Sequence, residues 1–479
     1  MGSGARRSVM IVGAGLAGAL LGCYLRRQGL EVDIYERRPD PRVQGWAGGR
    51  SINLALSARG IRGLAGVGLA ERVLAGAVPM SGRMIHGRAG ELTFQAYSKN
   101  PEDAINSVSR SGLNLVLIEA AQECGARLHF GHRCVDVDLD GPAAVFEVDE
   151  AGGVPGSVSV PPVVRRASAG LIVGADGAYS AVRARLARQE RFDYSQTYLA
   201  HGYKELHIPA LTPTAGPTTP AGRFALAPHA LHIWPRGGSM MIALPNTDGS
   251  FTCTLFWPFE GEHSFAALTT EAEAAAFFAR EYPDAPALMP TLTRDFFANP
   301  TGSLVTIRCW PWSHAGRVAL LGDAAHAIVP FFGQGMNAAF EDVVELDECL
   351  RRHEGDRAAG VAAYQRARKP NADAIADMAH ENFLEMRDAV GRPEFLYRKR
   401  VEQAVHELFP DRVAPLYNLV SFATVPYVEA RRRGRELDAV VERVVARVPA
   451  ARARELGVEA WKQEVRAAAA PVLEGGTRE

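Results

Sequence analysis

The pattern of apolar and polar positions at the start of the chain predicts a strand, a helix and a second strand. Val9–Val12 is a continuous apolar run of strand length, and Leu16–Gln28 repeats apolar residues at helical spacing. Gly29 follows, and glycine is the residue that most often ends a helix. Val32–Tyr35 has the composition of another buried strand. This order is typical of a Rossmann-like, doubly wound sheet.

The middle of the chain changes to a period of two. Leu231–Trp234, Met240–Leu244 and Phe251–Phe256 are strand-like, and short runs rich in glycine, asparagine and aspartate separate them. Alternate residues such as Leu231 and Ile233 share one face of a strand. The pattern therefore predicts an antiparallel sheet that interrupts the first lobe.

The C-terminal part is rich in alanine, arginine and glutamate, with valine and leucine at helical spacing around Arg431–Arg433 and 450–454. Because glutamate balances the arginine, we expect solvated helices that cover one side of the protein rather than a helix on a membrane surface. The predicted fold class is α/β (α+β): a Rossmann-like lobe, an inserted antiparallel sheet and a C-terminal helical region.

Composition narrows the functional classes. The 479 residues are 47% hydrophobic and 22% charged, and the net charge of −1 leaves no basic excess for nucleic acid. No apolar run reaches the roughly 18 residues of a membrane span, so we expect a cytoplasmic protein without a transmembrane helix. The six cysteines have no paired spacing, which indicates neither a disulfide framework nor a metal site.

A first glycine-rich stretch, 13–18, lies between the first strand and its helix. Glycines without side chains let the backbone approach a pyrophosphate, whose charge the helix N-terminus stabilises. Glu36, after the second strand, is placed to accept hydrogen bonds from an adenosine ribose and disfavours a 2′-phosphate, so the site should hold FAD rather than NADPH. The candidate FAD-binding residues here are Gly13, Gly15, Leu16, Ala17, Gly18, Glu36 and Arg37.

Two later stretches also follow strands. Asp176 stands at the end of one strand, and Asp323 stands at the end of another, where it can accept hydrogen bonds from ribityl hydroxyls. The helix starting near Gly335 directs its positive end toward the negative charge of a reduced flavin. For His326 we favour packing and donation to a backbone carbonyl over a catalytic role. The candidate FAD-binding residues here are Asp176, Asp323, Gly335, Met336 and Asn337.

Together these stretches resemble those of the single-component flavoprotein aromatic hydroxylases, and further segments are similar to the kynurenine 3-monooxygenase family in its soluble bacterial form. The resemblance covers roughly Val9 to Tyr427. It departs at the C-terminus, where eukaryotic members carry a membrane anchor and this chain has arginine-rich helices. The segments that carry it are 13–18, 49–57, 83–86, 107–110, 175–180, 191–196, 231–236 and 322–337.

The resemblance implies roles for individual residues. Arg83 and Tyr97 are implied as the clamp for the substrate carboxylate, since the guanidinium fork holds a carboxylate through two charge-assisted hydrogen bonds. Asn382 and Tyr417 match polar residues near the substrate. The resemblance also implies apolar residues that form a wall around an aniline ring. For these residues, packing in the protein core without substrate contact is an equally good interpretation. The implied wall consists of Leu231, Ile242, Leu244, Phe256, Pro330 and Phe331.

The resemblance also implies a reaction. NADPH reduces FAD, O2 adds at the flavin C4a carbon, and the hydroperoxide hydroxylates L-kynurenine to 3-hydroxy-L-kynurenine. Such chemistry needs positioning and water exclusion, so we assign no catalytic side chain. Arg50 and Arg110 are implied as FAD contacts. The chain has no second dinucleotide fingerprint that could bind NADPH. We therefore expect NADPH to bind near the second stretch, around Asp176.

Other functions stay open from the sequence. A hydroxylase of a related ortho-amino aryl ketone or of anthranilate would share these motifs. A flavin-dependent halogenase should carry Trp-x-Trp-x-Ile, which Ile233–Pro235 does not match, and a non-catalytic binding protein would purify colourless. We expect a monomer or homodimer. The predicted lobes are 1–190 with 300–370 for FAD, 75–110 with 191–299 for substrate, and 371–479 for the C-terminal helices.

Overall fold

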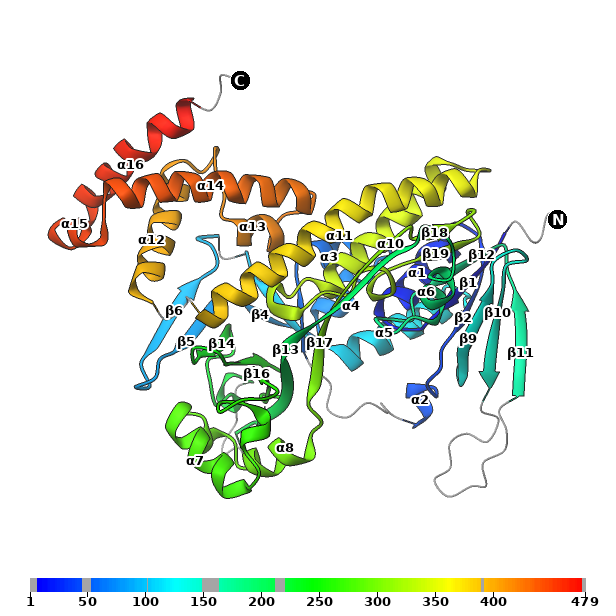
Figure 1. The fold of residues 1–479 in the computed structure, drawn as a ribbon, viewed down its shortest axis with the longest axis horizontal. Helices are drawn as coiled ribbons and strands as arrows, with labels where there is room; N and C mark the ends of the chain where they lie inside the picture. Colours follow the sequence, from blue (N-terminus) through cyan, green and yellow to red (C-terminus); the bar gives the residue numbers. More distant parts are fainter. Residues whose placement is uncertain are drawn as a thin grey trace.

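The computed structural model describes residues 7–44, 53–100, 102–148, 163–211, 220–388 and 392–475. Arg50, implied above as an FAD contact, lies outside the described residues. Within them the chain forms two large sheets and two small ones, and long helices lie across the top of the molecule in Figure 1.

A six-stranded, mostly parallel sheet forms the first lobe. Its strand order is β18 (Ser313–His314), β19 (Val318–Leu320), β12 (Leu171–Gly174), β1 (Ser8–Val12), β2 (Glu31–Tyr35) and β8 (Arg127–His129). The segments predicted at the start of the chain are confirmed as β1, α1 (Leu16–Arg27) and β2. Since β1, β12 and β19 run parallel, their carboxyl ends meet at one edge of the sheet. Each of these ends leads into one of the three glycine-rich stretches.

A seven-stranded sheet forms the second lobe. Its strand order is β17 (Gly302–Trp310), β13 (Asp193–Ile208), β16 (Phe251–Pro258), β15 (Met240–Pro245), β14 (Ala230–Pro235), β5 (Gly82–His86) and β6 (Leu92–Ala96). β14, β15 and β16 coincide with the three predicted strands and pair antiparallel. The pair of β5 and β14 is parallel, however, so the sheet is mixed. A long connection separates these two strands, and parallel pairing needs such a crossover.

β13 and β17 form a long ribbon that crosses the middle of the molecule between the two lobes (Figure 1). The boundary predicted at residue 300 therefore assigns to the FAD lobe a strand, β17, that belongs to the seven-stranded sheet. The range predicted for the substrate lobe also includes strands of another sheet. β4 (Val78–Met80) and β7 (Ile105–Ser109) pair with each other, and β7 also pairs with β3 (Asn53–Leu56). Local periodicity specifies strands but not their partners, which explains both differences.

The two faces of the seven-stranded sheet are covered by different elements. One face packs on α7 (Glu271–Glu281) and α8 (Leu292–Ala298), with Trp234 at the centre of a compact apolar core. The opposite face packs through Phe256 on Phe331, which lies within the third glycine-rich stretch. The second face is therefore the one that meets the FAD-binding lobe.

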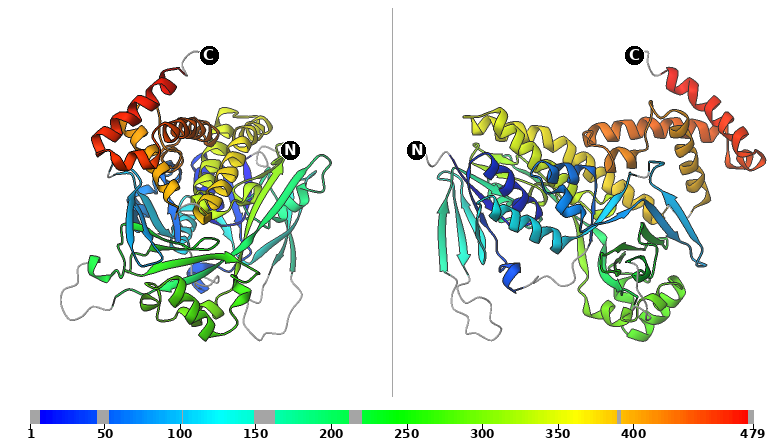
Figure 2. Two further views of the ribbon diagram at one scale, coloured as in Figure 1. Left: turned by 60° about the vertical axis from the view of Figure 1, so that its left-hand side comes forward. Right: turned by 180° about the vertical axis from the view of Figure 1, so that it is seen from behind.

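The predicted C-terminal helices are confirmed. They begin within α11 (Arg357–Asp388), which follows α10 (Gly335–Arg352), and continue as α12 (Pro393–Leu408), α13 (Leu416–Ser421), α14 (Tyr427–Arg447), α15 (Ala450–Glu455) and α16 (Val458–Gly475). The boundary predicted at residue 371 falls inside α11, which is one continuous helix. α12, α14 and α16 share an apolar core of their own and lie at the end of the molecule away from the six-stranded sheet (Figures 1 and 2).

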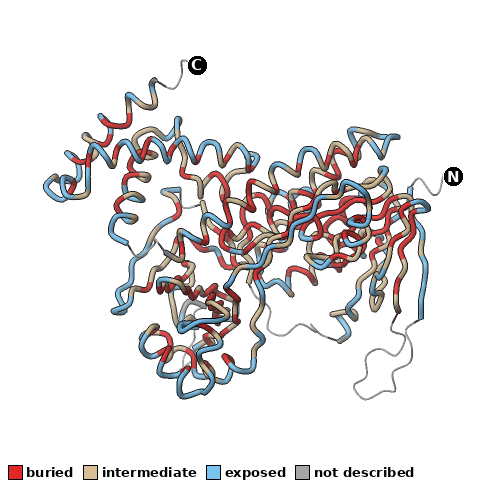
Figure 3. The backbone as a smooth tube through the Cα atoms, viewed as in Figure 1, coloured by how far each residue is buried: buried red, intermediate tan, exposed pale blue. Residues whose placement is uncertain are grey.

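Many of the buried residues lie in the six-stranded sheet and in the helices packed on it (Figure 3). The remaining helices and strands complete the lobes. The short elements are α2 (Pro41–Gln44), α3 (Ala58–Ala65), α4 (Ala70–Leu74), α5 (Arg110–Glu123), α6 (Ala181–Leu186), α9 (Asp323–His326), β9 (His132–Asp138), β10 (Ala143–Val148) and β11 (Val163–Ser168). Among the helices of the described ranges, none is both long enough and apolar enough to cross a bilayer.

Candidate active site

The first glycine-rich stretch forms a tight turn between β1 and α1. Gly13 has a φ of 106°, and a Cβ there would lie 2.5 Å from the Ala175 carbonyl oxygen, so only glycine fits. A Cβ on Gly18 would lie 2.0 Å from the Gly13 carbonyl oxygen and 3.2 Å from the Cγ2 of Ile11 in β1, so glycine lets α1 pack closely against the turn and the strand. A Cβ on Gly15, by contrast, would meet open space. The turn therefore leaves room for a phosphate beside the N-terminus of α1.

Glu36 connects the end of β2 to that turn. Its Oε2 accepts a hydrogen bond from the Ala14 N–H at 2.9 Å, and its Oε1 accepts one from the Arg38 N–H at 3.0 Å. These hydrogen bonds order the turn. Glu36 is only half-buried, so its carboxylate also remains accessible from solvent. The other candidates here, half-buried or exposed, are Leu16, Ala17 and Arg37.

Asp176 organises the second stretch at the start of α6. Its carboxylate accepts hydrogen bonds from the Ser180 hydroxyl at 2.6 Å and the Ala181 N–H at 2.7 Å. Burial raises the pKa of Asp176 above its ordinary value. Arg183 on the same helix donates to the Ala324 carbonyl oxygen at 2.8 Å, which ties the second stretch to the third. A direct contact of Asp176 with the cofactor stays a prediction.

The third stretch contains one exposed and one buried polar candidate. Asp323 is exposed at the first residue of α9, and no described residue hydrogen-bonds to its carboxylate. The side chain of Asn337 is buried, and it accepts from the Ser57 N–H at 3.0 Å and donates to the Ala55 carbonyl oxygen at 2.8 Å. Asp323 is thus available to a ligand, whereas the Asn337 side chain fixes the segment after β3. The other candidates, Gly335 and Met336, form the first turn of α10.

The hydrogen-bond partner expected for His326 is wrong. Its Nε2 lies 2.5 Å from the Oδ2 of buried Asp342 rather than beside a backbone carbonyl. Its ring stacks on Trp312, with centroids 5.1 Å apart, so the expected packing role is retained. Asp342 belongs to α10, and the packing of α10 against α9 that brings it to His326 could not be read from the sequence.

Arg83, Tyr97 and Tyr417 come together although they are far apart in the sequence. The Arg83 Cζ lies 4.4 Å from the ring centroid of Tyr417 and 5.6 Å from that of Tyr97, and the two rings stack at 5.0 Å. The Nε of Arg83 and the hydroxyl of Tyr97 are shielded from solvent, and no described residue hydrogen-bonds to either. Leaving a buried polar group unpaired costs about 1–3 kcal/mol. These two groups are therefore arranged for a ligand that supplies the missing partner.

The electrostatics of this clamp, defined as Arg83, Tyr97 and Tyr417, favour an anion. Burial alone lowers the pKa of Arg83, but the neighbouring Tyr417 and Tyr97 leave that pKa above its ordinary value. Burial raises the pKa of the Tyr97 hydroxyl well above its ordinary value. At neutral pH the guanidinium is charged and the phenol is protonated, so both can donate hydrogen bonds to a carboxylate.

The apolar candidates lie on the same sheet face as Arg83. The register pairs Leu231 with Arg83 and Ile233 with Ile242, and residues paired across strands share a face. Leu231 and Ile242 are half-buried and contact both apolar clusters on this face, so they lie where the two clusters meet. Of the other wall candidates, Leu244, Phe256 and Phe331 are buried and Pro330 is exposed.

Tyr417 and Asn382 connect the clamp to the third stretch. The Tyr417 ring stacks on Phe332, with centroids 5.7 Å apart. Asn382 on α11 donates from Nδ2 to the Phe331 carbonyl oxygen at 2.7 Å. The clamp therefore adjoins the segment that follows Asp323, as a shared site for substrate and flavin requires.

α5 contributes residues near the first glycine turn. Arg110, an implied FAD contact, is exposed at its first position. Asn114, one turn later, is buried and donates to the Ala14 carbonyl oxygen at 2.9 Å. The sequence analysis missed Asn114, although a polar residue among the apolar positions of α5 was a usable signal. It also missed a buried ion network around Arg59.

Comparisons with known proteins agree with this geometry. A family profile described as FAD binding domain matches residues 6–379. A protein named kynurenine 3-monooxygenase from Myxococcus xanthus (strain DK1622) is 46% identical over 474 residues, which cover 99% of this chain and 98% of the relative. Another of that name from Dictyostelium discoideum is 44% identical over 441 residues, covering 89% and 91% of the two chains.

Solved structures share the fold. The tetrameric form of 2-methyl-3-hydroxypyridine-5-carboxylic acid oxygenase aligns with a TM-score of 0.61 and 20% identity, covering 81% of this chain and 94% of that one. P. aeruginosa PqsL in complex with 2-aminobenzoylacetate aligns with a TM-score of 0.59 and 24% identity, covering 80% and 96%. At these identities the likeness is evidence of fold alone. The predicted fold class is confirmed.

Proposed function

Because the chain belongs to the kynurenine 3-monooxygenase family of FAD-dependent monooxygenases, we propose that it hydroxylates L-kynurenine to 3-hydroxy-L-kynurenine with NADPH and O2. One oxygen atom of O2 enters the ring beside the aromatic amino group. The other leaves as water, with one NADPH oxidised to NADP⁺ and one proton consumed. The cytoplasmic location and the monomeric or dimeric state expected from the sequence remain predictions.

The observation that carries the proposal is the pair of unsatisfied buried groups in the clamp. The Arg83 Nε and the Tyr97 hydroxyl lack partners among the described residues, beside the apolar residues Leu231 and Ile242. An aryl amino acid offers a carboxylate for the two polar groups and a flat ring for the apolar ones. Kynurenine has both parts.

The residues around the three stretches fit FAD. Open space at Gly15 beside the N-terminus of α1 suits a pyrophosphate, and the exposed Asp323 carboxylate suits ribityl hydroxyls. Arg183, donating to Ala324, keeps the second and third stretches in contact. When bound, FAD supplies the redox chemistry that activates O2.

The side chains of the protein act by positioning. The clamp anchors the amino-acid end of kynurenine, and the wall formed by Leu231, Ile242 and Phe331 excludes water from the ring. Anchoring one end of the substrate fixes the other relative to the flavin, and productive contact requires reacting atoms within about 3–3.5 Å. No side chain needs to transfer a proton to or from the ring carbon before oxygen transfer, which is consistent with the clamp containing no carboxylate or histidine.

NADPH is proposed to dock transiently beside the second stretch. Only the first stretch carries the glycine fingerprint and the following acid, and Glu36 there disfavours a 2′-phosphate. The second stretch lies at the same edge of the six-stranded sheet, as the parallel pairing of β12 with β1 requires. A nicotinamide donor at this edge can therefore approach the flavin without a dinucleotide-binding domain of its own.

Product analysis tests the proposal. The purified yellow protein is incubated with NADPH, O2 and L-kynurenine, and the products are identified by chromatography and mass spectrometry. We expect 3-hydroxy-L-kynurenine in about equal amount to the NADPH oxidised, because a well-positioned substrate captures the oxygen. Parallel incubations contain anthranilate instead of kynurenine, or NADH instead of NADPH.

Each incubation has a decisive outcome. FAD-loaded protein that hydroxylates anthranilate but not kynurenine would falsify the substrate assignment. Equal rates with NADPH and NADH would contradict the cofactor preference and leave the substrate assignment intact. A colourless preparation that cannot be loaded with FAD would contradict the whole proposal.

A further inference from the structure

Arg59 is a buried cation that joins the FAD-binding lobe to the C-terminal helices. It lies on α3 and is 1% exposed. Its Nη1 donates to Glu341 Oε1 at 2.6 Å. Its other hydrogen bonds to described residues go to the segment around the end of α13. The acceptors are the carbonyl oxygens of Leu419 at 3.4 Å, Val420 at 3.3 Å and Val425 at 2.5 Å.

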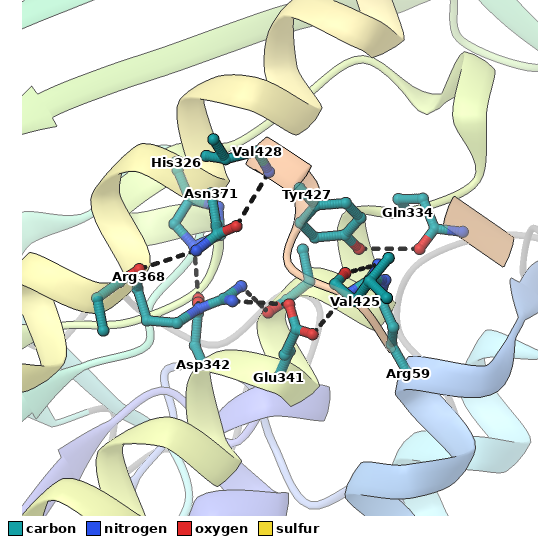
Figure 4. A network of polar contacts seen from close by, with 12 residues as sticks. Arg59, His326, Gln334, Glu341, Asp342, Arg368, Asn371, Val425, Tyr427 and Val428 are labelled. Atoms are coloured by element: carbon teal, nitrogen blue, oxygen red, sulfur yellow. Dashed lines mark hydrogen bonds and ion pairs between the residues drawn. The ribbon is translucent and has the colours of Figure 1, made fainter. Parts of the chain in front are cut away.

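The same network continues into the third glycine-rich stretch (Figure 4). Arg368 bridges Glu341 Oε2 at 2.6 Å and Asp342 Oδ1 at 2.7 Å. Asp342 Oδ2 accepts from the Gly322 N–H at 3.1 Å. Gly322 directly precedes Asp323, so an unbroken chain of ion pairs and hydrogen bonds leads from the flavin side to α13.

The charges of this network compensate one another. Arg59 and Arg368 face Glu341 and Asp342 in a region that excludes water. Burial alone raises the pKa of Asp342, yet His326 and Arg368 hold that pKa below its ordinary value. Arg59 also stacks on Tyr427, with its Cζ 3.9 Å from the ring centroid. Removing one buried member leaves its partner uncompensated, so the arrangement has little freedom to shift.

α13 is also the helix that carries Tyr417. Tyr417 contacts the guanidinium of Arg83 and stacks on Tyr97 and Phe332. α13 has only six residues and no side-chain cap, and its carbonyls at 419 and 420 are satisfied by Arg59. The position of Tyr417 in the clamp therefore depends on where Arg59 holds α13.

We propose that Arg59 is a positioning residue for substrate binding, because it fixes α13 to the flavin lobe and so holds Tyr417 against Arg83. This inference rests on the proposed function, since it assumes that the clamp binds kynurenine. The described partners of Arg59 include no residue of the clamp. Its effect passes through Tyr417.

The test replaces Arg59→Lys, which keeps the charge opposite Glu341 but cannot donate to three carbonyls from one planar group. Arg236→Lys is the matched control. Arg236 is also buried, donates to the carbonyls of His86, Gly87 and Glu281, and faces Tyr282, but it serves the sheet face away from the clamp.

We expect Arg59→Lys to retain FAD and to raise the KM for kynurenine about 10-fold or more, with kcat at saturation changed less than about 3-fold. Arg236→Lys should leave this KM within about 2-fold while lowering the melting temperature. In a Tyr417→Ala background, Arg59→Lys should raise KM by less than about 2-fold further, because residues that act through one another are not additive. Equal effects of Arg59→Lys with and without Tyr417 would overturn the inference.

A second variant covers the case in which Arg59→Lys does not fold. Glu341→Gln keeps an acceptor for Arg59 but removes its counter-charge, and we expect a smaller KM increase of about 3-fold that also disappears in the Tyr417→Ala background. An unchanged KM in Glu341→Gln would contradict the positioning role. If the unmodified protein loads FAD but binds no kynurenine, the proposed function fails instead, and the two failures are therefore distinguishable.

Discussion

The two faces of the seven-stranded sheet show how a folded core differs from a binding surface built on the same strands. On the face under α7 and α8, Trp234 is fully buried and its indole N–H donates to Asp284 at 3.0 Å. On the clamp face, Arg83 and Tyr97 keep buried polar atoms to which no described residue hydrogen-bonds, and Leu231 and Ile242 stay half-buried. The indole N–H on the first face has its partner within the protein, whereas we propose that a ligand supplies the missing partners on the second face.

The comparison predicts that damage to the covered face affects stability and damage to the clamp face affects binding. Alternation along each strand sends neighbouring residues to opposite faces. Trp234 and Ile233 are consecutive in β14 and yet belong to different apolar clusters. Substitutions one residue apart should therefore have different consequences.

Trp234→Ala should produce the largest effect, because it removes a fully buried indole from a packed core. We expect the free energy of unfolding to fall by about 3–5 kcal/mol, measured by urea denaturation. Leu231→Ala, on the other face of the same strand, is the control and should cost less, since that smaller side chain is only partly buried. An equal loss of stability for both variants would remove the distinction between the faces.

Arg83→Ala should have the opposite signature. Each charge-assisted hydrogen bond contributes about 1.5–3 kcal/mol, so losing a two-bond contact should weaken kynurenine binding by about 100-fold or more. Titration of the flavin absorbance with kynurenine measures this change. The free energy of unfolding should change less than the binding energy, because the Nε of Arg83 has no hydrogen bond to a described residue and only its contacts with the Tyr417 and Tyr97 rings are lost. Arg88→Ala, at an exposed position after β5, should bind kynurenine normally.

The smallest predicted effect is a dependence of stability on pH that originates on the covered face. Burial lowers the pKa of His232 from about 6.5 to about 4, with His86 and Asp284 as its titratable neighbours. The unfolded state therefore binds more protons between these values, so stability is full above pH 6.5 and is lost as the pH falls toward 4. The free energy of unfolding should drop by roughly 2 kcal/mol between pH 7 and pH 5.

His232→Gln isolates that contribution. The amide can still donate toward the Ala227 carbonyl oxygen that His232 Nε2 contacts at 2.9 Å, but it does not titrate. Denaturation curves at pH 7 and pH 5 should therefore differ less for the variant than for the unmodified protein. Kynurenine affinity should not follow the same pH profile, because His232 faces away from the clamp. A variant as acid-sensitive as the unmodified protein would count against this assignment.

The local parts of the fold could be predicted from the sequence. Continuous apolar runs located β1 and β2, and alternation located β14, β15 and β16. Both patterns depend only on which residues within one segment are buried, and not on the segment that pairs with it. The ribbon of β13 and β17 was not predicted. Residues 209–301 separate the two strands in the sequence, and both strands lie between the lobes, where neither periodicity dominates.

The sequence predicted those parts of the candidate site whose contacts are close in the sequence, and it did not predict the contacts between distant segments. Gly13 needs glycine for its positive φ, and Gly18 is constrained by the Gly13 carbonyl oxygen in the same turn, so their residue type alone indicated the geometry. The partners of Arg59 and His326 lie on other helices, at Glu341 and Asp342. Which buried charge meets which is decided by helix packing, and no spacing in the sequence records it. For His326 the general preference for a backbone carbonyl therefore gave the wrong partner.

The short helix α13 has a consequence for how the protein is made. The chain is synthesised from its N-terminus, so all three glycine-rich stretches leave the ribosome before Leu416. A nascent polypeptide that ends within α12 already contains the turns for FAD but lacks Tyr417 and the carbonyls that receive Arg59. If the clamp binds substrate as proposed, competence to retain substrate is acquired only after α13 has been translated.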